Sequence, residues 1–450
     1  MIISGGLPKS NGLFGRFSRK SYFGQHLLML LIGILHHRGR MSAQQAAGSI
    51  VGSSRHRAAV GRFLQSNVQP LSWMGNRCSR KLLAPARRGR GVYAFLIDTT
   101  LVGHQGQRTE NTFSTGNRRR RPAKGRRYGK YQHARRSCHA FVWGLLLTPD
   151  GRRIPSFRSY HTQDDCQRRK QPHRTQADLA AELVRQLLVP RAAEVFVIGD
   201  TAFESKQLRA ACAARGFYWI TPTNPERVLA GSKPRPKLWS WTQSFRSDRL
   251  APVRLLLDQG PWAAMRRIKR GSITSRTFYV HEERLDVHSL GKVRVVFSTK
   301  QLPPPGKPLN RDETKILLTN AEHRCVAEIL QLFLLRWQIE LFFKELKSSL
   351  GMHQYRFRDF QRVESWMHAY RIAFVYLEWI RVLRIRGSTT TRERQWWSCQ
   401  RTHGLGLAVC QRLEEQQLRT LARQAQTESG LRKLRKLLRN ALAKEYRHAA

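Results

Sequence analysis

The sequence predicts a mixed α/β protein in which a β-rich insertion interrupts the core and helical regions flank it at both ends. Three observations support this fold class. Short, continuous apolar runs such as "VYAFLID" (92–98) are typical of strands that are buried on both faces. Segments with a helical period of apolar residues alternate with these runs, and a block of strand-like segments punctuated by Pro and Gly comes after them. Long apolar helical patterns then return, so strands and helices are expected to share one core.

The composition is that of a folded and strongly basic chain. Its 450 residues suffice for two or three domains, and a hydrophobic content of 41% argues against a largely disordered protein. Lys and Arg number 81 against 30 Asp and Glu, which gives a formal charge of +51. Because such a surface repels itself unless a polyanion neutralises it, nucleic acid is the expected partner. An Arg-rich composition without functional meaning is the alternative, and the dispersed bases disfavour binding to an anionic membrane.

The cysteines and the most apolar segment bear on where the protein resides. Seven cysteines lie far apart without a Cys-x-x-Cys pair, which indicates free thiols in a reducing compartment and predicts no zinc site. The apolar run His26–Leu35 is too short to span a bilayer, and no clean small-residue cleavage site comes after it. We interpret this run as an early core helix and expect a cytoplasmic protein that does not contact a membrane.

The pattern along the chain divides it into regions of different character. They are a helical and basic N-terminal region (1–90), the first part of the α/β core (91–223), the β-rich insertion (224–320), the helices that complete the core (321–386) and a basic helical C-terminal region (387–450). Two short helices at 42–65 indicate either a DNA-binding module or an ordinary helical cap. The basic stretch at 116–136 indicates either a nucleic-acid contact loop or a solvated loop.

Each expected core element is explained by its local pattern. The first strand ends at Asp98, and the fourth, "EVFVIGD", ends at Asp200. A "PDGRR" turn joins two strands between them. The expected helices are 174–193, 204–216 with a Gly stop, 325–350 and 362–386, and the expected insertion strands contain "APVRLLL", "RTFYVHEERL", "KVRVVFSTK" and "TKILLTN". In the last helix, aromatic residues at 366, 370, 374 and 376 are expected to pack the helical layer.

Three carboxylates stand out as candidates for chemistry. Asp98 and Asp200 each come directly after a buried strand, and α/β proteins place their sites at that rim of the sheet. Glu340 lies on a long helix, and the three acids converge if this helix packs beside the sheet. Like charges at close quarters require cations or protons. Oxygen ligands select Mg²⁺ or Mn²⁺, and two such ions can activate a water or a 3′-hydroxyl and steady the leaving oxygen of a phosphodiester.

The helix "RWQIELFFKELKSSLG" (336–351) keeps one acid between several bases. At about 100° per residue, Arg336, Glu340, Lys344 and Lys347 lie in one narrow stripe. If Glu340 binds metal, these bases can grip the phosphates on either side of the scissile bond. An ordinary helix-face pairing of Glu340 with Arg336 or Lys344, worth a few tenths of a kcal/mol, is the alternative.

The ordered set of motifs resembles the DDE transposases of bacterial insertion sequences. Asp98 in "LIDTT", Asp200 in "VIGDTAF" and the helix "FLLRWQIELFFKELK" carry the resemblance, over roughly residues 90–355. More narrowly, the helix resembles the branch often called IS-four, whose signature is Tyr-x2-Arg-x3-Glu-x6-Lys. Arg336, Glu340 and Lys347 match this spacing, and Phe333 stands in place of the Tyr.

The resemblance implies an RNase H-like catalytic core and a cut-and-paste DNA transposase. It implies metal-dependent hydrolysis at the element's ends, and then attack of the freed 3′-hydroxyl on target DNA. Asp98, Asp200 and Glu340 would hold two Mg²⁺ ions, which Mn²⁺ can replace. The DNA contacts would come from the signature helix, at Phe333, Arg336, Lys344 and Lys347. Phe333 keeps a stacking face but lacks the Tyr hydroxyl.

The resemblance also implies partners and a place in the cell. The partners are double-stranded DNA, as terminal inverted repeats and target, and a second copy of the chain in the DNA-bound synaptic complex. The expected location is the bacterial cytoplasm, in association with the nucleoid. An inactive or domesticated DNA-binding copy and an RNase H-like nuclease that cuts without joining are the alternatives. Asp164 and Asp165 lie in a polar loop without a preceding apolar strand, so we expect them to be solvated.

Overall fold

The computed structural model describes most of the chain between residues 57 and 390 and shorter pieces outside this span. The described residues are 13–14, 21–36, 57–84, 91–104, 109–115, 136–231, 235–243, 249–256, 275–304, 307, 309–311, 313–390, 393, 415, 422, 425–429 and 431–432. The predicted basic loop (116–136, apart from its last residue), residues 42–56 and most of the predicted C-terminal region (387–450) therefore lie outside the described residues.

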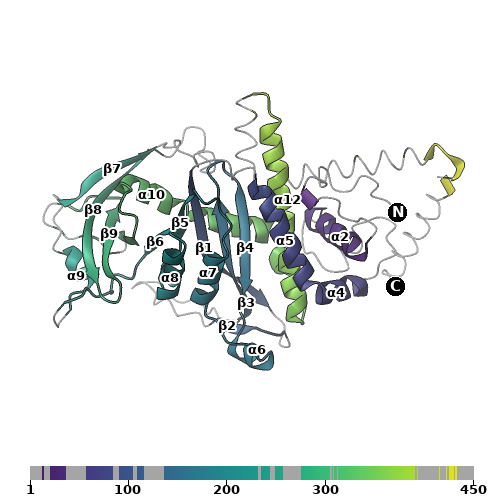
Figure 1. Cartoon of the computed structure of the whole chain (residues 1–450), viewed down its shortest axis with the longest axis horizontal. Coiled ribbons are helices and arrows are strands. Elements are labelled where there is room, and N and C mark those ends of the chain that lie inside the picture. The colour runs from purple at the N-terminus through teal and green to yellow at the C-terminus, as the bar shows by residue number, and fades with distance from the viewer. Residues whose placement is uncertain are drawn as a thin grey trace, which may run out of the picture.

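Within the described residues, ten strands form one mixed sheet. Figure 1 shows their arrangement. Their order is β2-β3-β1-β5-β6-β10-β9-β8-β7, with β4 also paired to β3. The strands are β1 (Val92–His104), β2 (Phe113–Thr115), β3 (Arg136–Leu147), β4 (Arg153–Ser159), β5 (Glu194–Ile198), β6 (Tyr218–Pro222), β7 (Ala251–Leu256), β8 (Ser275–Val287), β9 (Gly291–Thr299) and β10 (Lys315–Thr319). Parallel pairing joins β1 to β5 and β5 to β6, and the other pairs are antiparallel. The predicted mixed α/β class is confirmed.

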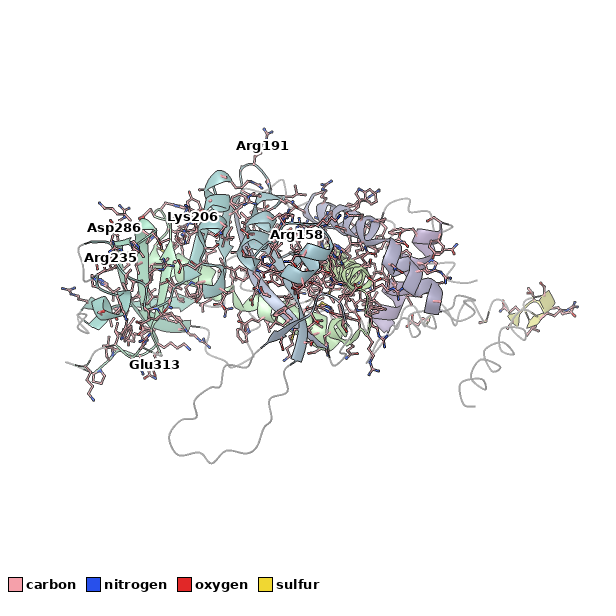
Figure 2. All side chains as sticks on the ribbon, turned by 90° about the horizontal axis from the view of Figure 1, so that it is seen from below. Arg158, Arg191, Lys206, Arg235, Asp286 and Glu313 are labelled. Carbon is pink, nitrogen blue, oxygen red and sulfur yellow. The ribbon has the colours of Figure 1, made fainter. Side chains whose placement is uncertain are left out.

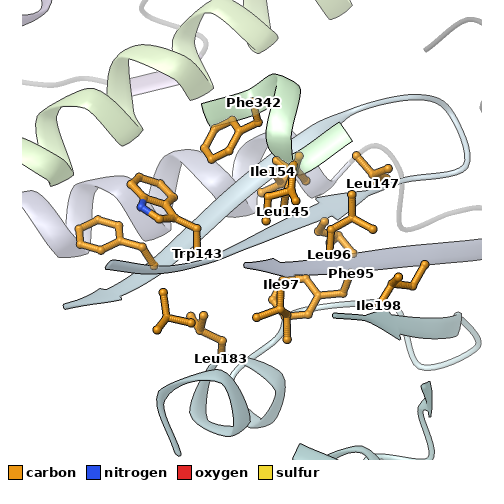
Figure 3. Packing of buried hydrophobic residues seen from close by; sticks show 14 of the residues in the cluster. Phe95, Leu96, Ile97, Trp143, Leu145, Leu147, Ile154, Leu183, Ile198 and Phe342 are labelled. Atoms are coloured by element: carbon orange, nitrogen blue, oxygen red, sulfur yellow. The ribbon is translucent and has the colours of Figure 1, made fainter. Parts of the chain in front are cut away.

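Helices cover both faces of the central strands. The helical elements are α2 (Tyr22–His36), α4 (Arg57–Ser66), α5 (Val68–Leu83), α6 (Gln163–Arg168), α7 (Gln176–Arg185), η2 (Thr201–Phe203), α8 (Lys206–Ala214), α9 (Leu238–Gln243), α10 (Val326–Leu334), α11 (Trp337–Lys344), η5 (Glu345–Ser349), η6 (Met352–Gln354) and α12 (Phe360–Arg386). Figure 3 shows Phe342 of α11 on one side of the sheet and Leu183 of α7 on the other, with Trp143 of β3 between them. The apolar strand runs are therefore buried on both faces, as their lack of alternation predicts.

Two predicted packing elements are confirmed. The aromatic residues of α12 that we expected in the helical layer, Trp366, Tyr370, Phe374 and Tyr376, are all fully buried. α12 packs against α5, α4, α2 and β4, so it is surrounded on several sides and lacks a polar face. The apolar run at 26–35 forms most of α2, whose side chains belong to the same core. In the part of the chain that the structure describes, no helix has the length and apolar character needed to cross a membrane.

The strands of the β-rich block continue the core sheet. β10 pairs with β6 on one side and with β9 on the other, so β7, β8 and β9 are added to the edge of the central strands (Figure 1). The side chain of Asn320, just after β10, accepts a hydrogen bond from the backbone N–H of Trp219 at 2.8 Å. The "ILLTN" segment thus joins the block to the core at β6.

The helix predicted over residues 325–350 is interrupted twice. Backbone bonds of the i→i+3 type, such as Arg336 N–H to the carbonyl of Phe333 at 3.0 Å, separate α10 from α11. After Lys344 the backbone widens into the π-turn η5, where Leu350 N–H donates to the carbonyl of Glu345 at 3.1 Å. α10 packs against β5, β6 and β7, whereas α11 packs against β1. A single straight helix is thus replaced by segments that track different strands of one twisted sheet.

Candidate active site

Strand register brings the two predicted aspartates to the same level of the sheet. β1 and β5 are neighbouring parallel strands, and their last paired residues are Leu96 and Ile198. Asp98 and Asp200 each lie two residues further along, and adjacent strands are about 4.8 Å apart. The prediction that the first strand ends at Asp98 is wrong, because β1 continues to His104 along its other neighbour, β3. The edge of the sheet beside Asp98 is therefore formed by the end of β5 and not by the end of β1.

Each aspartate is oriented by the residue after it. The carboxylate of Asp98 accepts a hydrogen bond from the backbone N–H of Thr99 at 2.7 Å, and that of Asp200 accepts one from Thr201 at 2.7 Å. The hydroxyl of Thr99 donates to Gln176 of α7 at 2.9 Å. Both Asp-Thr pairs use the same local geometry, so both carboxylates are held at this edge by backbone groups of the sheet and its first turn.

The electrostatics of Asp98 indicate a cluster of like charges. The pKa of Asp98 is raised from 3.8 to about 6, chiefly by burial, and the Thr99 N–H opposes this rise. The negative charges of Asp200 and Glu340 contribute to the rise, while the positive charge of Arg336 opposes it. All three predicted acids therefore lie near enough to interact. We call Asp98, Asp200 and Glu340 the carboxylate edge.

Glu340 is paired with a base in this arrangement. Its carboxylate lies 2.7 Å from the guanidinium of Arg336, one helical turn earlier, and both side chains are partly exposed. The i,i+4 pairing that we considered as an alternative is therefore present. It does not exclude a metal role, because a partly exposed pair of this kind contributes only a few tenths of a kcal/mol and exchanges easily.

The carboxylate edge fits a divalent cation by its donor chemistry. It offers carboxylate oxygens, the ligands that Mg²⁺ and Mn²⁺ prefer, and a cation would offset both the burial and the repulsion that raise the pKa of Asp98. Among the residues that the structure describes, no three acidic, His or Cys side chains are already gathered closely enough to hold one ion. Glu340 must leave Arg336 before it can join the two aspartates at such an ion.

The predicted DNA-contacting residues lie in different environments. Lys344 is exposed, whereas the ammonium of Lys347 donates to the carbonyl of Leu101 in β1 at 2.9 Å. Burial lowers the pKa of Lys347, and the nearby charge of Asp98 opposes this effect. Phe333 is half-buried and packs against the core. The predicted single stripe of bases is therefore only partly present, because η5 changes the helical period between Lys344 and Lys347.

A second group of charges beneath the edge was not predicted. The Arg153 guanidinium lies 2.9 Å from Glu345 and 2.6 Å from Glu378, and Arg381 lies 2.7 Å from Glu378. All four residues are buried. We call them the ion-pair cluster. The sequence signal was the presence of Glu345, Glu378 and Arg381 inside otherwise apolar helical stretches, which by itself does not identify their partners.

Two other charged features bear on the site. Asp165, which we expected to be solvated, is buried and lies 2.8 Å from His161 and 2.9 Å from Arg169, so that prediction is wrong for this residue. Asp165 thus has its own structural partners. On the surface, charged side chains project in many directions, among them Arg191 and Lys206 (Figure 2). A basic surface of this kind suits a polyanionic partner.

Comparison with models of protein families gives a match over most of the core. The family model described as "Transposase DDE domain" matches residues 93–377, which is more than half of the chain. The match includes the whole carboxylate edge and extends into α12. No curated protein matches the sequence.

Proposed function

Because the chain belongs to the DDE transposase family and is a DNA transposase, we propose that Asp98, Asp200 and Glu340 are its catalytic, metal-binding carboxylates. The observation that carries this proposal is the register of β1 and β5, which sets both aspartates two residues beyond the last parallel pair. The effect of Glu340 on the pKa of Asp98 supports the third member.

The enzyme cleaves DNA and transfers the cut strand in a reaction that depends on a divalent metal. We propose two Mg²⁺ ions, which Mn²⁺ can replace, held by Asp98, Asp200 and Glu340. When bound, such ions supply an activated oxygen nucleophile and stabilise the charge on the leaving oxygen. The contribution of the chain is to orient the ligands. The N–H groups of Thr99 and Thr201 hold the two aspartates before any ion arrives.

The proposed DNA contacts come from the segment around α11. Arg336 pairs with Glu340, and the charges of Arg336 and Lys347 interact with that of Asp98, so both bases lie close to the carboxylate edge. A DNA phosphate would replace Glu340 as the ion-pair partner of Arg336. Lys347 and the exposed Lys344 would bind phosphates further along the DNA strand. Phe333 is half-buried, so a contact with a base would use the exposed part of its ring. The spacing of these residues is consistent with the IS-four branch, to which we assign the chain.

The remaining parts of the proposal concern partners and organisation. We propose that the DNA comprises terminal inverted repeats and a target, that two copies of the chain act together on DNA, and that the protein associates with the nucleoid. The proposed regions are 1–90 for DNA binding, 91–223 and 321–386 for the catalytic core, 224–320 for the insertion and 387–450 for a basic C-terminal extension.

A strand-transfer assay tests the site. The full chain is incubated with Mg²⁺, a labelled duplex carrying the inverted repeats that flank the coding region, and a target plasmid. Asp98→Ala, Asp200→Ala and Glu340→Gln are each expected to lose cleavage by at least about a thousandfold while binding of the duplex survives. Glu182→Gln on α7, which replaces a carboxylate paired with Arg158 and Arg174, is the matched control. Cutting at the wild-type rate by any of the three variants would refute the assignment of that residue.

A further inference from the structure

Glu345 lies close to the proposed catalytic acid in sequence but faces the opposite way. It is the first residue of η5 and lies five positions after Glu340, so at about 100° per residue the two side chains point roughly 140° apart. Glu345 is 4% exposed, whereas Glu340 is partly open to solvent. Lys347, two residues further on, reaches back to β1. The same short segment therefore presents one acid to the interior and an acid and a base to the carboxylate edge.

Arg153 ties this inward-facing acid to the sheet. Its guanidinium donates to Glu345 at 2.9 Å and to Glu378 of α12 at 2.6 Å, and it lies over the ring of Phe374. Arg153 is the first residue of β4, where it pairs in register with Leu147 of β3. β3 in turn is the neighbour of β1, which carries Asp98. A chain of rigid elements thus connects Glu345 to the strand beneath the site.

The apolar neighbours of Glu345 hold the segment in place but select its rotation poorly. Phe342 and Leu346 are buried in the core, and burial of apolar area depends little on direction. A charged hydrogen bond between buried groups depends strongly on direction, because a rotated Glu345 would lose its contact with Arg153, which would keep Glu378 as its carboxylate partner. The ionic contact therefore penalises every rotation of the segment except the observed one.

We propose that Arg153 and Glu345 are positioning residues, which fix the rotation of α11 and η5 so that Glu340 and Lys347 face Asp98 and Asp200. This inference rests on the proposed catalytic role of Glu340. The competing explanation is that the ion-pair cluster only stabilises the fold. The two explanations predict different metal affinities when the charges are replaced by apolar groups that fill the same space, since such replacements often keep or improve stability.

The test uses the full chain and measures two properties. Thermal unfolding reports the fold, and electron paramagnetic resonance of free Mn²⁺ reports binding of this ion without DNA. The principal variant is the double replacement Arg153→Met with Glu345→Leu, in which Glu378 keeps Arg381 as a partner. The matched control is Arg152→Met. Arg152 is also buried and adjacent to Arg153, but its guanidinium donates to the carbonyl of Leu82 at 2.6 Å and pairs with Asp150.

The expected result separates positioning from stability. The double variant should unfold within a few degrees of the wild type, yet its Mn²⁺ affinity should fall about tenfold, the usual effect of removing a group that orients a metal ligand. Arg152→Met should keep the wild-type affinity even if it unfolds earlier. If the double variant does not fold, Arg153→Lys decides instead. It keeps the positive charge but lacks the planar fork by which the guanidinium bonds Glu345 and Glu378 from separate nitrogens, so an affinity loss of at least about threefold is expected.

Two outcomes would overturn the inference, and they are distinguishable. If Glu340→Gln lowers the Mn²⁺ affinity but the double variant or Arg153→Lys does not, Arg153 and Glu345 only stabilise the fold and the proposed site stands. If Glu340→Gln binds Mn²⁺ like the wild type, the proposed role of Glu340 fails, and the positioning role fails with it.

Discussion

The carboxylate edge holds half-buried acids and the ion-pair cluster holds buried ones, with opposite electrostatic results. At the edge, burial and two neighbouring carboxylates raise the pKa of Asp98 to about 6. In the cluster, burial alone would raise the pKa of Glu378, but the charges and hydrogen bonds of Arg153 and Arg381 outweigh it and lower the pKa. The first arrangement compensates its negative charge only in part, through Arg336, and the second compensates it fully with buried Arg partners.

This difference supports our proposal that the acids of the carboxylate edge serve the reaction. Carboxylates gathered without cations repel each other, and we propose that an external cation completes this group. Buried acids with fixed Arg partners are instead the usual form of a structural group. Glu340 is intermediate between these two kinds of acid. It is paired with Arg336, but both side chains are partly exposed, and we propose that a DNA phosphate can replace Glu340 as the partner of Arg336. The comparison predicts opposite responses when individual acids are removed.

The largest effect on stability is expected in the ion-pair cluster. Glu378→Ala removes a carboxylate partner from both Arg153 and Arg381, which remain buried. We therefore expect a loss of about 3–5 kcal/mol in the free energy of unfolding. Glu182→Ala, which breaks the more exposed pairs of α7, should cost no more than about 1 kcal/mol. Chemical denaturation of both variants measures the contrast. Equal losses would mean that burial of the pair does not matter.

The next effect concerns the binding of a cation at the carboxylate edge. Mn²⁺ at one hundred times its dissociation constant should stabilise the wild-type protein by about 2.7 kcal/mol, because the ion binds the folded state alone. Asp200→Asn should abolish this gain, while Glu182→Gln, which changes an acid paired with Arg158 and Arg174, should retain it. Melting temperatures measured across a Mn²⁺ titration give the answer. An undiminished rise in the melting temperature of Asp200→Asn would contradict a metal role for this residue.

A smaller effect is expected from pH in the absence of metal. Asp98 has an ordinary pKa of 3.8 and a folded pKa of about 6, so between these values the folded state holds the extra proton. Stability therefore falls as pH rises from about 4 to 6, and the cost persists above pH 6. Asp98→Asn does not titrate, so in EDTA it should melt above the wild type at pH 7.5, with a difference that shrinks toward pH 4. A difference in melting temperature that does not depend on pH would show that the Asp98 carboxylate does not lie in a cluster of like charges.

The smallest effect is expected at Arg336. If it exchanges Glu340 for a phosphate, Arg336→Ala should reduce the slope of log affinity for DNA against log salt by about 1. Arg191→Ala is the matched control, because this exposed base precedes β5 and so lies at the opposite end of that strand from Asp200. Filter binding at several salt concentrations measures both slopes. Equal changes in the two variants would show that Arg336 acts only through net charge.

Local sequence patterns determined much of this protein. Continuous apolar runs identified the core strands, and the spacing of Arg336, Glu340 and Lys347 identified the helix that carries the third acid. The excess of bases indicated a nucleic-acid partner. These features depend on neighbouring residues and on composition, which a sequence states directly.

Only the tertiary structure decided which of these residues meet. Asp98 and Asp200 lie at the same level of the sheet because Leu96 pairs with Ile198. No local pattern specifies a register between strands about a hundred residues apart. The breaks around α11 and the burial of Glu345 against Arg153 likewise arise from packing on a twisted sheet. Periodicity reports which face of a segment is apolar, whereas the partner of a buried charge is chosen by the whole fold.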